Sequence, residues 1–282
     1  MIRSVLVPAD FSDESALIHR FAAGLGTLGV RRVVLGHVVD AGGKEGPVIA
    51  AEMDEARDSV RASADSLTRA GLDTEVRIAA DANPSDGILG LAAEAHVDAI
   101  VCGSHGKSPA EALAAGSVSE DVLVNSDVPM LMVRFELLRN VAEPAQLVRS
   151  FGRILVLATD FSAAAMRALM TVLDLPAGSV GTMFLVHALD PSLDGERLQR
   201  AQTGAEFQLD NMVDMAAQKG ISARSVLRQG EPSRVILSEV DERRASGVVA
   251  GTRGRGPLTG ALLGSVSLTL LRQASCPVMI VH

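Results

Sequence analysis

The chain has 282 residues, of which 48% are apolar, and carries a formal net charge of −8. This length accommodates two ordinary domains, each with enough apolar residues for its own core. The acidic balance argues against a general nucleic-acid-binding protein, because a phosphate backbone requires a basic surface.

The composition also restricts the core and the compartment. The sequence has no Trp, no Tyr and 7 Phe, so the core must be largely aliphatic. Cys102 and Cys276 lie in or beside apolar runs, which predicts buried thiols and neither a disulfide framework nor a metal cluster. The amino-terminal segment enters an apolar strand without signal-peptide features, and no apolar run reaches the length of a membrane span. We therefore expect a cytoplasmic protein with no membrane partner.

An internal repeat determines the predicted architecture. An apolar strand that leads into Asp10-Phe-Ser matches one that leads into Asp160-Phe-Ser, 150 residues later, and Ala-rich helical stretches follow both. Ser12 and Ser162 are predicted N-caps of these helices. A second strand at 32–40 matches one that ends at Asp190, again offset by 150 residues.

Each repeat continues with a long helix, near 46–69 and 193–219, and a third strand. Pro84 and Pro232 then open a short helix, where the missing N–H of proline costs least. Because these prolines are 148 residues apart, the second repeat has two fewer residues between Asp190 and Pro232. We place this deletion in the second helix or its flanking loops.

The fourth strand of each repeat runs into a glycine-rich segment with the pattern Gly-x2-Gly-x9-Gly-Ser. The first copy begins at Gly103 and the second at Gly251, 148 residues later, and a helix follows each. Glycine allows close backbone approach, and a helix N-terminus offers N–H donors and a positive dipole end. One copy could be a flexible surface loop with a Ser N-cap. Two copies at one offset favour a phosphate site.

A fifth strand closes each repeat, at 129–134 and 277–282. Alternating strands and helices, with continuous apolar strand runs, predict an α/β fold with parallel sheets covered by helices on both faces. The predicted domains are residues 1–136 and 151–282, joined by a linker at 137–150 that breaks the repeat.

These features resemble the universal stress protein family, in its tandem two-domain, ATP-binding form. The resemblance rests on the two glycine motifs, the strand-Asp-Phe-Ser openings, the turn at 230–234 and the closing Cys276-Pro-Val. It implies two five-stranded, Rossmann-like nucleotide-binding domains related by pseudo-twofold symmetry. Single-domain members dimerise through the fifth strand, so the resemblance also implies an intramolecular pseudo-dimer, with or without a further homodimer.

The resemblance further implies two sets of nucleotide-binding residues. Asp10 and Asp160 would hydrogen-bond the adenosine moiety, although each could equally be a charge at a helix N-terminus. Val38 and Ala188 would offer backbone groups to adenine, and the glycine loops with the helix starts would hold the phosphates. The first set is Pro8, Ala9, Asp10, Val38, Gly103, Gly106, Gly116, Ser117, Val118 and Ser119. The second set is Ala158, Thr159, Asp160, Ala188, Gly251, Arg253, Gly254, Gly264, Ser265, Val266 and Ser267. Ser119 and Ser267 would add hydroxyl donors.

The two repeats differ at several of these positions. Ala82 stands where the second repeat has Gly230, and Ala158 replaces Pro8. The loop cations also change: His105 and Lys107 in the first repeat become Arg253 and Arg255 in the second. Cations here favour a triphosphate or are simply solvated.

Little in the sequence predicts turnover. Neither loop is a Walker A motif, because the complete Gly-x4-Gly-Lys-Ser/Thr pattern is absent, and no carboxylate pair or histidine cluster accompanies the loops. His37 and His187 lie within apolar strands and are expected to be packed and hydrogen-bonded. The resulting hypothesis is an ATP-binding stress-response or regulatory protein, with or without Mg²⁺, that is not an enzyme. The alternatives are a slow ATPase or adenylyl-transfer enzyme of the same superfamily, and an interaction protein with vestigial sites.

Overall fold

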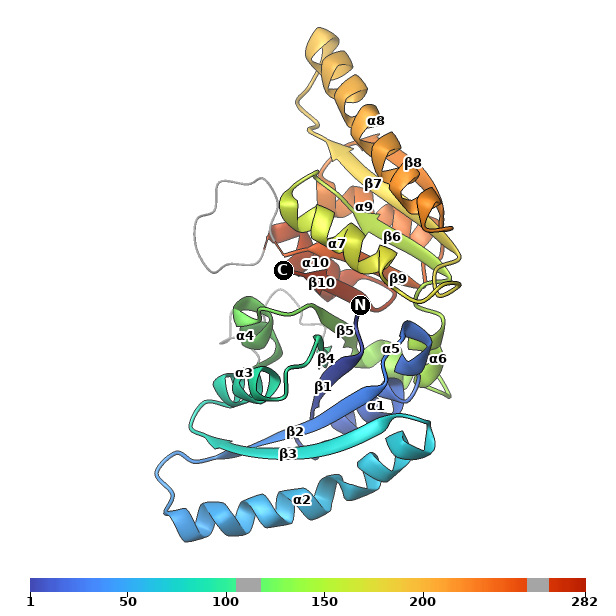
Figure 1. Cartoon of the computed structure of the whole chain (residues 1–282). Helices are drawn as coiled ribbons and strands as arrows, with labels where there is room; N and C mark the ends of the chain where they lie inside the picture. The colour runs from blue at the N-terminus through green and yellow to red at the C-terminus, as the bar shows by residue number, and fades with distance from the viewer. Residues whose placement is uncertain (105–117, 253–263) are drawn as a thin grey trace. The chain divides into compact units, whose positions relative to one another are not determined.

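The computed structural model describes residues 1–104, 118–252 and 264–282. The chain divides into two compact units, Met1–Arg149 and Ser150–His282, and each is described by itself (Figure 1).

The first unit contains a parallel sheet in the order β3-β2-β1-β4-β5. Its described elements are β1 (Ser4–Pro8), α1 (Asp13–Ala22), the 3₁₀ helix η1 (Leu25–Leu28), β2 (Arg32–Asp40), α2 (Gly46–Arg69), β3 (Asp73–Asp81), α3 (Pro84–Glu94), β4 (Ala99–Ser104), α4 (Val118–Asn125), β5 (Met130–Arg134), α5 (Phe135–Arg139) and α6 (Ala145–Arg149).

The second unit repeats this topology in the order β8-β7-β6-β9-β10. Its described elements are β6 (Ile154–Ala158), α7 (Ala163–Leu173), β7 (Thr182–Leu189), α8 (Gly195–Gln218), β8 (Ser222–Gln229), α9 (Pro232–Glu242), β9 (Gly247–Gly251), α10 (Ser265–Gln273) and β10 (Val278–Val281). The predicted α/β fold with two tandem parallel-sheet domains is confirmed.

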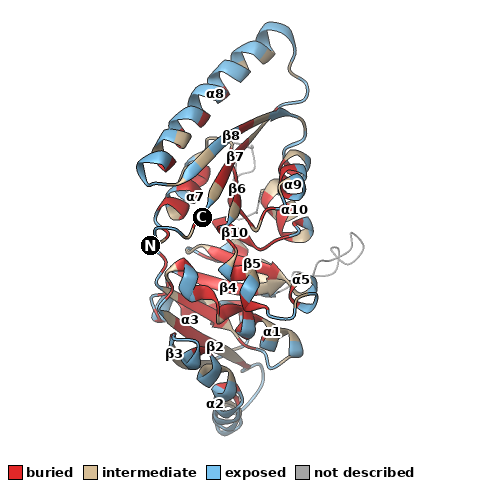
Figure 2. Cartoon of the chain, turned by 90° about the vertical axis from the view of Figure 1, so that its right-hand side faces the viewer, coloured by how far each residue is buried: buried red, intermediate tan, exposed pale blue. Residues whose placement is uncertain are grey.

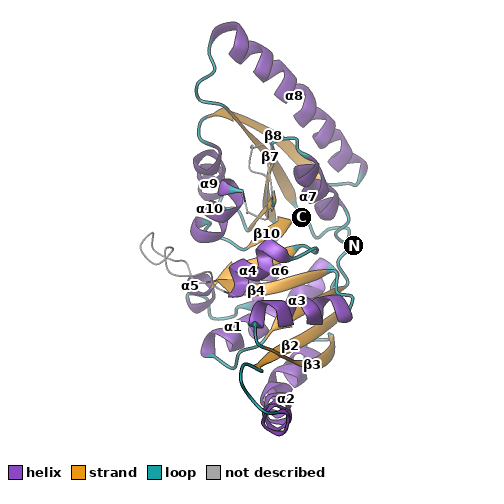
Figure 3. Ribbon diagram, turned by 90° about the vertical axis from the view of Figure 1, so that its left-hand side faces the viewer, coloured by secondary structure: helices purple, strands orange, loops and turns teal. Residues whose placement is uncertain are grey.

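Helices cover both faces of each sheet. In the second unit α9 and α10 pack against each other on one face, and α7 lies on the other (Figure 3). Apart from the edge strands β3 and β8, the strands between these layers are largely buried, whereas the outer faces of the helices are exposed (Figure 2). Strand β1 shows the aliphatic core expected from the composition, because Val5, Leu6 and Val7 are almost fully buried.

Both cysteines are buried, as predicted, and they do not form a disulfide bond with each other. Burial raises the pKa of the Cys102 thiol to about 12. Cys102 is therefore a thiol at neutral pH and is chemically inert.

The predicted helix starts are also confirmed. The Ser12 side chain accepts a hydrogen bond from the Ser15 N–H, and that of Ser162 accepts one from the Ala165 N–H. Pro84 and Pro232 lie in the first turns of α3 and α9. Both helices therefore begin where the sequence pattern placed them.

The segment for which we predicted a linker forms the short helices α5 and α6. These helices pack against α1, and α6 also contacts η1. Leu138 and Val148 are fully buried, and the Arg20 guanidinium donates a hydrogen bond of 3.0 Å to the Ala142 carbonyl. The segment up to Arg149 therefore packs as part of the first unit.

The two-residue deletion spares the long helix, since α2 and α8 both have 24 residues. One residue is missing from the loop before α8. The other is missing from the third strand, which has 9 residues in β3 and 8 in β8.

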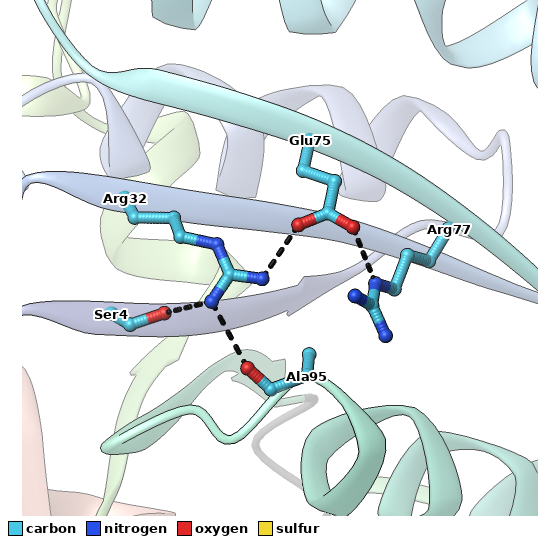
Figure 4. Close-up of polar contacts among 5 residues, drawn as sticks. All are labelled: Ser4, Arg32, Glu75, Arg77 and Ala95. Carbon is cyan, nitrogen blue, oxygen red and sulfur yellow. Dashed lines mark hydrogen bonds and ion pairs between the residues drawn. The ribbon is translucent and has the colours of Figure 1, made fainter.

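Ion pairs connect the edge strand of each unit to its neighbours, at different positions. In the first unit Glu75 on β3 accepts hydrogen bonds of 2.6 Å from both Arg32 and Arg77 (Figure 4). The hydrogen bonds from these two guanidinium groups lower the pKa of Glu75. In the second unit the buried Glu239 on α9 pairs with Arg243 at 2.5 Å and with Arg228 on β8 at 3.3 Å.

Candidate functional site

The predicted site residues gather at the carboxyl ends of the strands. In the first unit β2 and β4 flank β1, so the strand order reverses beside β1. Asp10 follows β1, Val38 lies near the end of β2 and Gly103 near the end of β4. Open parallel sheets bind ligands at this reversal of strand order. The second unit places Asp160, Ala188 and Gly251 at the corresponding strand ends.

The turn after the first strand has the same unusual conformation in both units. Phe11 and Phe161 each have a φ of 61°, a left-handed conformation that bulky residues rarely adopt. The Phe11 ring centroid lies 4.3 Å from that of His37, and the Phe161 centroid lies 4.4 Å from that of His187. Backbone strain of this kind concentrates at functional sites, where the surrounding structure maintains it.

The two aspartates stabilise these turns. Asp10 Oδ1 accepts hydrogen bonds from the N–H and the hydroxyl of Ser12, at 3.1 and 2.6 Å. Asp160 Oδ1 accepts one from the Ser162 N–H at 3.0 Å. Each carboxylate therefore supports the turn before a helix through Oδ1. Because a carboxylate has a second oxygen, this role is compatible with the predicted contact to adenosine.

His37 and His187 are hydrogen-bonded, as expected. His37 Nδ1 lies 2.6 Å from the Ala9 carbonyl, and His187 Nδ1 lies 2.8 Å from the Thr159 carbonyl. Since a carbonyl only accepts, each ring donates from Nδ1. The two histidines therefore fix the backbone immediately before Asp10 and Asp160.

Hydrogen bonds connect the described ends of the second glycine loop. The Gly264 N–H donates to the Thr252 carbonyl at 2.9 Å, and Ser267 Oγ donates to the Gly251 carbonyl at 2.7 Å. Gly264 is the N-cap of α10 and offers no capping side chain. The first-turn N–H groups of α10 therefore begin beside the end of β9, an arrangement suited to a phosphate.

The Ser267 contact changes one predicted role. The sequence pattern assigned its hydroxyl as a phosphate donor, but the single hydroxyl proton is directed to the Gly251 carbonyl. In this arrangement Ser267 can serve a phosphate only through its N–H, because phosphate oxygens accept hydrogen bonds. Its hydroxyl instead holds the helix start against the strand end.

The first glycine of each motif is required for packing. A Cβ on Gly103 would lie 2.2 Å from the Phe135 ring, and one on Gly251 would lie 2.8 Å from the Ala164 backbone. These glycines allow α5 and α7 to approach the strand ends closely. This reason holds with or without a bound nucleotide.

Part of each predicted phosphate loop lies outside the described residues. The predicted binding residues in this group are Gly106, Gly116, Ser117, Arg253 and Gly254. The loop cations His105, Lys107 and Arg255 also lie outside them. In the first unit the described part of the loop region consists of Gly103 and Ser104 at the end of β4 and the α4 start at Val118 and Ser119.

A compensating exchange of side-chain volume, which sequence reasoning missed, lies beside the proposed adenine positions. A Cβ on Gly87 of α3 would lie 2.6 Å from Val38 Cγ1. The equivalent pair in the second unit is Val235 on α9 and Ala188 on β7. The larger side chain is therefore on the strand in the first unit and on the helix in the second. Val235 Cγ2 lies 3.0 Å from the position of a Cβ on Gly230. This crowding explains why the second repeat has glycine where the first has Ala82, a pattern visible only when the aligned repeats are compared pair by pair.

The described residues offer neither a metal-binding group nor a membrane-spanning helix. No group of three or more His, Cys, Asp or Glu side chains there could hold a metal ion. No helix within the described ranges is long and apolar enough to cross a membrane.

Comparisons with known proteins agree on one family. The universal stress protein family model matches residues 1–134 and 151–282. The universal stress protein YxiE of Bacillus subtilis is 40% identical over 98 residues, covering 35% of this chain and 66% of YxiE. The universal stress protein Rv2005c of Mycobacterium tuberculosis is 40% identical over 68 residues, covering 24% of this chain and 22% of that protein. In both cases the chain spans less than two thirds of the relative's length.

A solved structure extends the similarity to the whole chain. The crystal structure of a universal stress protein from Archaeoglobus fulgidus matches with a TM-score of 0.74 at 26% identity, covering 99% of this chain and 95% of that one. Because the family model also matches both repeats, the chain belongs to the universal stress protein family.

Proposed function

We propose that this protein binds ATP in one site per unit, and that nucleotide occupancy tunes its conformation or its contacts with a protein partner in a stress response. One observation carries the proposal: in the second unit, the end of β9 and the uncapped start of α10 are hydrogen-bonded together at the reversal of strand order. The first unit has the same motif and the same Asp-Phe-Ser turn.

The donor set fits an adenine nucleotide. Backbone N–H groups at the start of α10 suit phosphate oxygens, and Asp160 lies at the end of the adjacent strand β6. No cluster of metal-ligating side chains occurs among the described residues. We propose that any Mg²⁺ ion arrives with ATP and is held mainly by the phosphate oxygens.

We propose a binding protein in preference to an enzyme. Each histidine beside the turns uses its Nδ1–H to hold a backbone carbonyl, so its role there is structural. Lys107 and Ser108 follow Gly106, but neither glycine loop has the complete Walker A pattern Gly-x4-Gly-Lys-Ser/Thr. A slow ATPase, an adenylyl-transfer enzyme and a protein with vestigial sites are the alternatives that experiment must separate.

Titration calorimetry of the full chain with ATP tests the proposal. We expect close to two ATP per chain, and mass spectrometry of the purified protein should identify the adenine nucleotide that co-purifies. A chain that binds no ATP would refute the proposal and favour vestigial sites. If only one site binds, we expect it to be the second, because Arg253 and Arg255 add positive charge to its loop.

A further inference from the structure

A buried polar cluster lies beneath the nucleotide-site turn of the first unit. The Asp10 N–H donates a hydrogen bond of 3.3 Å to Ser15 Oγ, which lies 3.4 Å from His19 Nε2. His19 Nδ1 lies 2.9 Å from Ser63 Oγ on α2. Ser15 and His19, both on α1, are buried. Through these two side chains Asp10, which follows β1, is connected to the long helix α2.

The second unit replaces this cluster with apolar residues. Ala165 and Leu169 stand 150 residues after Ser15 and His19, and both are buried. Met212 stands 149 residues after Ser63, which is the offset between α2 and α8. All three polar residues are therefore exchanged together, although the turn above them keeps the same conformation.

A different residue supports the second turn. Thr159 occupies the position of Ala9, and its Oγ1 accepts the Phe161 N–H at 3.0 Å. The same hydroxyl lies 3.8 Å from Met212 Sδ on α8. The second turn thus carries its own hydroxyl, whereas the first depends on side chains supplied from α1 and α2.

We propose that His19 is a positioning residue for the first nucleotide site, holding Asp10 after the end of β1 through Ser15 and connecting it to α2 through Ser63. This inference rests on the proposed ATP binding. Whichever ring nitrogen carries the proton, the imidazole can donate to one serine hydroxyl and accept from the other, because Ser15 lies at Nε2 and Ser63 at Nδ1. Losing the cluster loosens Asp10 and weakens nucleotide binding at the first site only, because Leu169 takes the place of His19 in the second unit.

The test uses the full chain and replaces the polar cluster of the first unit with the residues that the second unit has at the same positions. The variant S15A/H19L/S63M installs the apolar set of the second unit, and adding A9T supplies the hydroxyl of Thr159. Hydrogen–deuterium exchange is followed across an ATP titration in peptides covering residues 9–22 and 159–172. Unfolding in urea confirms that each variant is folded.

In the wild type we expect ATP to protect both peptides. In the triple variant, protection of residues 9–22 should require about tenfold more ATP, the size expected for losing one or two hydrogen bonds, with residues 159–172 unchanged. Adding A9T should restore most of the loss, an outcome that a purely stabilising role of His19 does not produce.

Wild-type ATP dependence at residues 9–22 in the triple variant would overturn the inference while leaving ATP binding intact. If neither wild-type peptide responds to ATP, the proposed function and this inference fall together. Should the triple variant not fold, S15A alone decides, since it removes the hydroxyl that joins the Asp10 N–H to His19 and leaves the imidazole in place. An S15A chain with unchanged protection would contradict the role of the cluster.

Discussion

The hydroxyl of Ser267, within the first turn of α10, donates a hydrogen bond of 2.7 Å to the carbonyl of Gly251 at the end of β9. This contact brings together the two ends of the segment that carries the second Gly-x2-Gly-x9-Gly-Ser motif. The helix N-terminus is thereby held beside the strand end before any ligand arrives, so a phosphate would meet donors that are already oriented.

The first prediction concerns Gly264, the N-cap of α10. Gly264→Val should abolish ATP binding at the second site while the fold survives, because a branched side chain at the helix start blocks close phosphate approach. Calorimetry should fall from about two ATP per chain to about one, with an unchanged circular dichroism spectrum. The matched change in the first repeat, Gly116→Val, should remove the other site. Normal ATP binding by Gly264→Val would show that this loop does not hold the phosphates.

A second prediction is that turnover is slow. The histidines beside the turns hold backbone carbonyls, and neither glycine loop has the complete Walker A pattern. Phosphate release from ATP should therefore remain well below roughly 1 per second, the lower end of ordinary enzyme rates. A steady-state rate in the ordinary range would reveal a catalytic group that the present interpretation lacks.

The internal repeat made much of the fold predictable. Strand ends, the caps Ser12 and Ser162 and the buried cysteines all follow local patterns, and each pattern occurs twice. Helices α5 and α6 were missed because helices of 5 residues have almost no intrinsic stability and form here by burying Leu138 and Val148.

The candidate site was predictable only in outline. The glycine motifs placed its main parts at the strand ends, but side-chain contacts between distant segments decide the details. Sequence spacing does not show that Ser267 donates to Gly251, or that His19 reaches Ser63 across 44 residues. The exchange of Gly87 and Val38 for Val235 and Ala188 likewise depends on which side chains meet in three dimensions.

A third prediction compares two carboxylates that form ion pairs with two arginines each. The Glu239 side chain is 3% exposed and that of Glu75 is 39% exposed. Removing a buried charge leaves its partners without compensation, whereas exposed pairs contribute little. Glu239→Gln should therefore reduce the free energy of unfolding by about 1–3 kcal/mol, and Glu75→Gln by less than about 1 kcal/mol. Urea unfolding followed by circular dichroism measures both, and equal effects would contradict this ranking.

The last prediction concerns acid sensitivity in the first unit. Burial lowers the pKa of His19 from 6.5 to about 4, although the Pro8 carbonyl and the Asp10 charge act in the opposite direction. The unfolded chain therefore binds a proton at His19 more readily than the folded chain does. The resulting stability is fully present above pH 6.5 and is lost as the pH falls toward about 4. Between pH 7 and pH 5 the loss should be about 2 kcal/mol.

The variant H19L/S63M provides the control, because it carries the Leu and Met that the second unit has at these positions. Carboxylates whose pKa is lowered by hydrogen bonds, such as Glu75, also lose stability in acid, so the decisive quantity is the difference between the two proteins. We expect exchange of residues 9–22 to accelerate from pH 7 to pH 5 in the wild type, after correction for intrinsic exchange rates, and to change much less in the variant. If both proteins respond equally, His19 does not titrate as a buried neutral imidazole, and the acid sensitivity of the first unit arises from its carboxylates.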